Sequence, residues 1–173
     1  MDITPRATRF FFVAMACALA HAAVSAYWAL GGGWGLDGVG QWAVQFRSQS
    51  PMLTAAALLV TALVKLAAGV VPYLASVGRL AGRRTWRALS WAGAGLLVTY
   101  GGLNTGVGGA ALAGVIEGPA DPARRDALRM HVLLWDPAFL VWGIALAAAL
   151  WLSRRPIVDP TGPASAPRSR LAS

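Results

Sequence analysis

The stretch FFFVAMACALAHAAVSAYWAL, residues 10–30, decides the fold, because it contains no lysine, arginine, aspartate or glutamate. Three further apolar stretches follow it, at residues 52–77, 88–116 and 130–152. A helix needs about 20 mostly apolar residues to cross the roughly 30 Å hydrocarbon core of a bilayer. Each stretch is long enough, so the sequence predicts an all-α fold, a four-helix transmembrane bundle.

The chain is expected to form one membrane domain, residues 1–155. Its predicted spans are about 10–30, 52–77, 88–107 and 130–152. The third stretch is longer than a bilayer requires and is rich in glycine after Tyr100, so we expect its helix to bend or break beyond Val107. Residues 156–173 are mostly Pro, Ser, Ala and Arg, a composition that predicts a disordered cytoplasmic tail.

Composition supports a membrane protein and limits the alternatives. Hydrophobic residues make up 57% of the 173-residue chain and charged residues 13%, against about 45–50% and about 25% in ordinary globular domains. The net charge of +8 does not indicate a nucleic-acid partner, because the arginines stand at the ends of the apolar stretches, where topology signals occur. Cys17 is the only cysteine, so no internal disulfide can form. The expected partner is the lipid bilayer.

The arginines also predict an orientation. Two lie at the N-terminus, four in the loop at residues 78–87 and four in the tail, whereas four others lie in the first and third connections. With both termini cytoplasmic, ten basic residues are inside and four outside, as the positive-inside rule requires. We therefore expect a multi-pass protein of a bacterial plasma membrane with both termini in the cytoplasm.

A cleaved signal peptide is the alternative interpretation of the first stretch. Arg6 and Arg9 precede its apolar core, and Ala18-Leu19-Ala20 has the form of a cleavage site. The apolar run continues to Leu30, however, which is long for a signal core and suits a span.

Polar groups inside the predicted spans are the best candidates for a functional site, because they are costly in hydrocarbon and usually face a protein interior or a wet cavity. His21 lies near the middle of the first span, and Ser25 follows one turn later on the same face. Lys65 lies near the middle of the second. Asn104 and Asp136 lie in the outer parts of the third and fourth. These five residues form the candidate ligand-binding cluster.

The cluster has two interpretations. Each residue could serve packing alone, with Lys65 and Asp136 joining helices, Asn104 bonding a nearby backbone and His21 buried in a core. Groups at similar depth on all four helices are more than packing requires, which favours a polar pocket that opens outward and holds a small or lipid-like ligand. Lys65 and Asp136 are then the expected ion pair.

The Asp136-Pro137 step should start or kink a helix. Pro137 suits the first helical position, and Asp136 is suited to cap the free amides of the first turn.

No catalytic motif stands out. The two histidines and the carboxylates lack zinc-site spacing such as H-E-x-x-H, and nothing matches a nucleophile elbow or a phosphate loop, so neither metal nor cofactor is predicted. Two further functions stay open beside the binding pocket. One is a membrane enzyme that uses His21, Lys65 or Asp136 as acid or base, and the other is an accessory subunit of a larger membrane complex. The oligomeric state is not predicted.

Two segments carry a family resemblance. HAAVSAYWALGGGWGLD, residues 21–37, is similar to the opening signature of a bacterial family called domain of unknown function 3995, and LWDPAFLVWG, residues 134–143, resembles its last segment. The members are small membrane proteins with four predicted helices. The resemblance implies the same fold but no activity. It argues against signal cleavage, because the first segment straddles the cleavage region.

Overall fold

The computed structural model describes residues 3–154, and all regular structure in this part is helical. The predicted all-α fold is thus confirmed, while the predicted tail at 156–173 lies outside the described residues. The elements are α1 (Pro5–Ala29), the 3-10 turn η1 (Asp37–Val39), α2 (Gln41–Gln49), α3 (Pro51–Ser76), α4 (Arg83–Leu112), α5 (Pro122–Met130), the π-helical turn η2 (His131–Trp135) and α6 (Asp136–Leu152).

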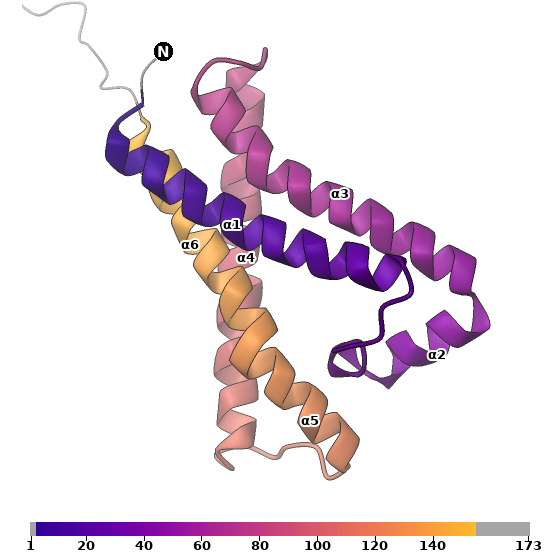
Figure 1. The fold of residues 1–173 in the computed structure, drawn as a ribbon. Helices are drawn as coiled ribbons and strands as arrows, with labels where there is room; N and C mark the ends of the chain where they lie inside the picture. The colour runs from indigo at the N-terminus through magenta and orange to yellow at the C-terminus, as the bar shows by residue number, and fades with distance from the viewer. Residues whose placement is uncertain (1–2, 155–173) are drawn as a thin grey trace, which may run out of the picture.

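Within residues 3–154, three helices are long and apolar enough to cross a membrane. They are Pro5–Ala29, Pro51–Ser76 and the continuous helix Pro122–Leu152 that α5, η2 and α6 form together. The third predicted span, 88–107, lies within α4, which is not among the three, so a crossing by α4 stays a prediction. Glycines, Ser90, Thr99 and Asn104 make α4 less apolar, although it is a 30-residue helix that runs the length of the bundle (Figure 1).

α4 continues as one helix past Val107 and ends at Leu112, within the stretch where we expected a bend or break. It ends where Gly114 adopts a positive φ of 72°, a conformation that glycine takes without steric cost. The amide of Val115 donates to the carbonyl of Ala110, and the amide of Gly114 donates to that of Ala111. This pair of bonds is the usual termination of a helix by glycine. The earlier glycines of α4, from Gly93 to Gly109, have no positive φ and lie inside the helix.

The four long helices form two pairs. α1 packs along α3, α4 packs along α6, and the pairs join mainly through contacts of α1 with α6. In Figure 1 the start of α1, the end of α6 and the α3–α4 connection lie at one end, here called the termini end. The turn η1, α2 and α5 lie at the opposite end, here called the loop end, toward which the two pairs separate.

Small residues bring the helices of the termini end and the middle into close contact. A Cβ atom on Gly101 would lie 2.5 Å from the backbone nitrogen of Leu140, and one on Gly143 would lie 2.8 Å from that of Val98. Glycine at these positions therefore sets the approach of α4 to α6. The buried core beside this contact is Phe11, Ala14, Ala18, Ala94, Trp142, Ala145, Leu146, Ala149 and Leu150.

The outer faces of the helices are apolar as well. Large hydrophobic side chains are exposed along α3, among them Leu59, Val60, Leu63 and Val64, each more than half exposed. A soluble monomer rarely exposes so continuous an apolar surface, whereas hydrocarbon solvates it. The arrangement is that of an integral membrane protein.

Candidate functional site

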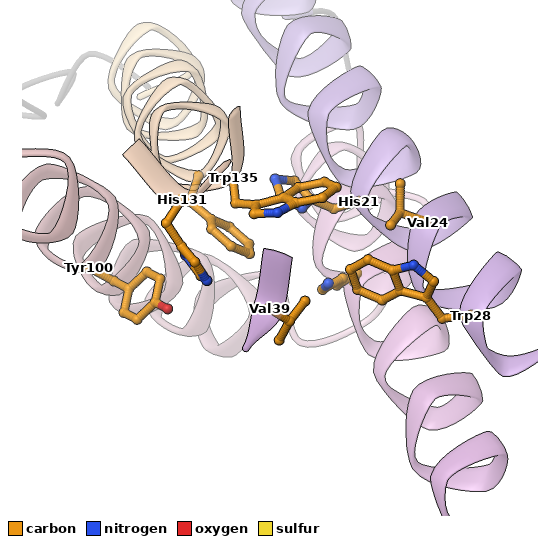
Figure 2. A pocket seen from close by; sticks show the side chains of 9 residues that line it. His21, Val24, Trp28, Val39, Tyr100, His131 and Trp135 are labelled. Atoms are coloured by element: carbon orange, nitrogen blue, oxygen red, sulfur yellow. The ribbon is translucent and has the colours of Figure 1, made fainter. Parts of the chain in front are cut away.

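A cavity of about 170 Å³ lies where the helix pairs separate, on the loop-end side of the packed core. Helices α1, α3, α4 and α6 contribute to it together with the turns η1 and η2, as Figure 2 shows. Its walls are mostly aromatic, and four polar side chains interrupt them. The lining residues are His21, Val24, Trp28, Val39, Lys65, Tyr100, His131, Trp135 and Phe139.

His21 faces this cavity from α1 and is only 6% exposed. Its ring stacks on Phe139 of α6, with centroids 4.0 Å apart and planes 12° from parallel. The Nε2 atom is buried and finds no hydrogen-bond partner among the described residues. The stacking holds the ring in place and leaves one nitrogen with its hydrogen-bonding capacity unused.

Lys65 enters the cavity from α3. Its ammonium group donates a 2.9 Å hydrogen bond to the hydroxyl of Ser25, which is 1% exposed. The same nitrogen lies 5.7 Å from the centre of the Phe139 ring, within the range of a cation–π contact. An ammonium group can donate three hydrogen bonds, so the bond to Ser25 leaves capacity for a ligand.

Asp136 is 2% exposed and pairs with His131, at 3.3 Å between its Oδ1 and the Nδ1 of the histidine. The π-helical turn makes this contact possible. In η2 the amide of Asp136 bonds the carbonyl of His131, five residues back instead of four, which brings these two side chains to one side of the helix. Asp136 itself stands behind His131 and does not line the cavity.

Two details of the predicted cluster are corrected by these contacts. The expected ion pair of Lys65 with Asp136 is not formed, because Lys65 bonds Ser25 and Asp136 bonds His131. The α-helical segment α6 does begin at the Asp136-Pro137 step, but no side chain caps it, because η2 runs into it without interruption.

Asn104 is the third correction. It is exposed on α4, and its amide donates to the carbonyl of Tyr100 one turn back in the same helix. It therefore satisfies its own helix and does not line the cavity. Of the five predicted residues, His21 and Lys65 line the cavity, Ser25 holds Lys65 in place and Asp136 holds His131 in place.

Sequence reasoning missed His131, Tyr100 and the aromatic walls. His131 stands five residues before Asp136, a spacing that separates side chains on an α-helix and aligns them only in a π turn. Tyr100 packs edge-on against Phe139, with ring centroids 5.7 Å apart. Tyr100 lies one turn before Asn104, and this position was the available signal. We instead chose Asn104 as the polar residue of this helix because of its amide, and it is Tyr100 that lines the cavity.

The connection between α1 and α3 borders the cavity through Val39 of η1. It is fixed by polar contacts to its own backbone: the Trp28 indole donates to the carbonyl of Trp34 at 2.9 Å, and Arg47 donates to that of Gly32 at 2.6 Å. Trp28, Leu36, Ala43 and Trp135 form a second buried apolar cluster at this end. The cavity lies between this cluster and the larger core.

No group of three or more His, Cys, Asp or Glu side chains in residues 3–154 is close enough to hold a metal ion. The cavity instead offers an ammonium group, two imidazoles and a phenol beside aromatic faces. Such a set can bind the polar end of an apolar molecule, and an imidazole paired with a carboxylate can also transfer a proton.

Fold and site together define a helical integral membrane protein with a partly polar cavity between its helices. Residues 18–146 match the model of the family described as protein of unknown function (DUF3995), and this chain belongs to that family. The resemblance noted in the two signature segments is thus confirmed. No curated protein and no solved structure matches the sequence significantly.

Proposed function

We propose that this protein binds a small amphipathic molecule in the cavity, with the polar head of that molecule against Lys65 and His21. The observation that carries the proposal is the Lys65 ammonium group, which lines a largely aromatic cavity and has Ser25 as its hydrogen-bond partner instead of a carboxylate. A half-buried cation with no carboxylate partner in residues 3–154 is costly within a membrane, and an anionic ligand would offset that cost.

The surrounding groups narrow the chemistry of the ligand. The Nε2 atom of His21 and the Nε1 atom of Trp135 are buried without hydrogen-bond partners in the described part of the chain. The indole nitrogen can only donate, and the ammonium group can only donate. A carboxylate or carbonyl head therefore fits better than an amine, and the rings of Phe139, Trp28 and Trp135 suit an apolar body.

Binding of decanoate and decylamine to the purified full chain in mild detergent tests the proposal, because the two probes share an apolar chain and differ in head charge. Decanoate should change the tryptophan fluorescence and raise the thermal midpoint, and decylamine should not. Lys65→Met should weaken decanoate binding by about tenfold or more, the value of one charge-assisted hydrogen bond. Asn104→Ala, outside the cavity, is the control and should bind normally. Equal responses to the two probes, or unchanged binding to Lys65→Met, would refute the proposal.

A second candidate is a membrane enzyme, and the pair of His131 with Asp136 favours it. A carboxylate on one imidazole nitrogen orients the ring and leaves the other nitrogen for proton transfer. Lipid extract incubated with the purified protein should then show a changed component by mass spectrometry, and Asp136→Asn should abolish the change. An extract unaltered by the wild-type protein would remove this candidate.

The proposed setting is a bacterial plasma membrane with both termini cytoplasmic. The arginine distribution supports it, together with the position of the start of α1, the end of α6 and the α3–α4 connection at one end of the bundle (Figure 1). A reporter that is active only in the cytoplasm, fused after residue 173, should be active. Activity of an exported reporter at that position would reverse the orientation. If the protein is instead an accessory subunit, a larger complex should co-purify with it.

A further inference from the structure

A second hollow lies at the other end of the bundle, separate from the cavity around Lys65. It is an apolar groove of about 160 Å³ between α3, α4 and α6. Gly93 leaves it open, since a Cβ atom at this position would meet nothing within 4 Å. The walls include Val71 and Pro72 of α3, Trp86 and Leu97 of α4, and Leu146 of α6.

Arg87 lies next to the groove residue Trp86, near the termini end. Its guanidinium group donates to the hydroxyl of Ser76 on α3 at 3.5 Å, to that of Ser153 at 3.0 Å and to the carbonyl of Leu150 on α6 at 2.7 Å. Ser76 follows the groove residue Pro72 by one turn, and Leu150 follows Leu146 by one turn. Arg87 therefore lies beyond the apolar walls of α3 and α6 and at the level of Trp86 on α4.

More positive charge surrounds this point. Arg83 precedes Arg87 by one turn on α4, and its Nε atom is buried without a partner among the described residues. Arg84 is exposed beside it. The first turn of α4 has no side-chain cap and no acidic residue, so its free amides and the positive end of the helix dipole add to the same field.

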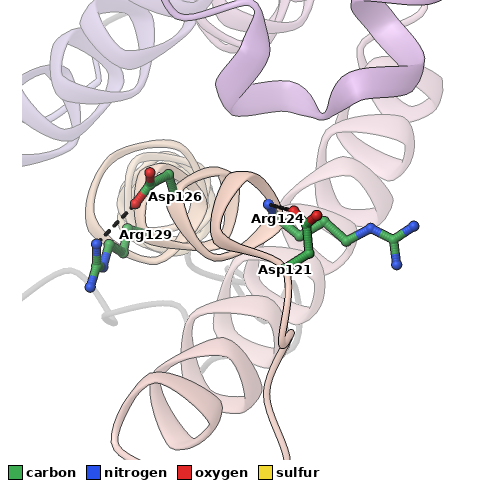
Figure 3. A network of polar contacts seen from close by, with 4 residues as sticks. All are labelled: Asp121, Arg124, Asp126 and Arg129. Atoms are coloured by element: carbon green, nitrogen blue, oxygen red, sulfur yellow. Dashed lines mark hydrogen bonds and ion pairs between the residues drawn. The ribbon is translucent and has the colours of Figure 1, made fainter.

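Carboxylates, by contrast, are confined to the loop end of the described chain. Asp37 is in η1, Glu117 and Asp121 precede α5, Asp126 is in α5, and Asp136 starts α6. Figure 3 shows the result for α5, where Arg129 pairs with Asp126 at 2.9 Å and Asp121 caps the helix through the amide of Arg124. The arginines beside the groove have no such partner in residues 3–154.

We propose that the groove binds one acyl chain of an anionic phospholipid whose phosphate head lies against Arg83, Arg84 and Arg87. The apolar walls face the depth of the bilayer and the arginines face its surface, which is the order of groups in a phospholipid. A net negative head offsets a cluster of three guanidinium groups at a helix N-terminus, and a zwitterionic head does so only in part.

Native mass spectrometry of the full chain tests this site, with dioleoyl phosphatidylglycerol and dioleoyl phosphatidylethanolamine as probes. One molecule of the anionic lipid should be retained in preference to the zwitterionic one. Arg83→Gln with Arg84→Gln should reduce that preference by about tenfold or more, because each basic residue contributes about fivefold at an anionic surface. The matched control is Arg124→Gln with Arg125→Gln at the loop end, which should keep the preference.

A second pair of variants tests the groove itself and does not alter charge. Gly93→Leu should fill the hollow and expel the retained lipid. Gly95→Leu is its control, since Gly95 lies on the same helix, is exposed and has equally open space around it. Thermal midpoints in detergent report whether each variant folds. If the arginine variant does not fold, lipid retention by Gly93→Leu and Gly95→Leu tests the proposal by itself.

Three results would overturn the proposal. They are equal retention of the two lipids by the wild-type chain, an equal loss of preference in the two arginine pairs, and equal retention by Gly93→Leu and Gly95→Leu.

Discussion

The two ends of the bundle differ in how closely their helices pack. From the middle to the termini end, small residues let α4 approach α6 and let α1 approach α3 closely. Arg87 ties α3, α4 and α6 together by hydrogen bonds. At the loop end the helix pairs separate, and aromatic rings with His21, Lys65 and His131 surround a cavity. The close packing of one half provides the rigid base from which the other half can open.

The comparison predicts that stability resides at the termini end, and Arg87 gives the largest expected effect. Arg87→Met removes bonds to α3 and α6 and leaves the buried Ser153 hydroxyl with fewer partners, so it should lower the free energy of unfolding by about 2–3 kcal/mol. Denaturation in mixed micelles measures the loss. Arg84→Met, on an exposed side chain, should change it by less than about 0.5 kcal/mol. Equal losses would mean that Arg87 does not join the helices.

The next effect concerns the contact of α4 with α6. Gly101→Ala places a methyl group against the backbone of Leu140 and should lower the free energy of unfolding by about 1–3 kcal/mol. Gly102→Ala is the matched control, because its methyl group would meet only the end of the Leu140 side chain at 3.8 Å. The control should be neutral or stabilising, since alanine favours helix over glycine. A stable Gly101→Ala would show that this close approach is not required.

A smaller effect is expected for the coupling between polar side chains at the loop end, where two possible pairs of Asp136 can be compared. The double-mutant cycle of His131→Phe and Asp136→Asn should show a coupling of about 1 kcal/mol, because these side chains are in contact. The cycle of Lys65→Met and Asp136→Asn should show less, since Lys65 bonds Ser25 instead. The reverse ranking would restore the ion pair between Lys65 and Asp136.

The smallest effect is expected at Asn104, whose amide bonds its own helix on an exposed face. Asn104→Ala should change the free energy of unfolding by no more than about 0.5 kcal/mol. A loss above about 1.5 kcal/mol would show that the residue packs against something outside the monomer.

The sequence predicts the helices well, because each apolar stretch is bounded by residues with simple roles. Pro51 marks the start of α3, where a missing amide hydrogen does no harm, and Pro137 follows the π turn at which α6 begins. The end of α4 was harder, since five glycines look alike in sequence and only Gly114, beyond them, adopts the terminating conformation. The apolarity of α4 was overestimated for a related reason, because glycine lengthens a stretch without making it hydrophobic.

The candidate site was predicted in part. His21 and Lys65 could be found because a single ionisable group inside an apolar helix points to a protein interior. The partners could not be found, because they depend on how the helices rotate about their axes. Asp136 meets His131 only through the π turn, and Lys65 meets Ser25 only through the packing of α3 on α1.

The turn η2 has a consequence for the register of the last helix. A π turn contains one residue more than the α-helical turn it replaces, and one residue corresponds to about 100° of rotation about the axis. Removing Val132 would let the helix rewind as a regular α-helix from Pro122 to Leu152. The segment before it would then swing about the axis by roughly that angle, and a different face of α5 would meet η1. Two homologous chains that differ by a single residue here could keep identical α6 helices and still present different side chains at the mouth of the cavity.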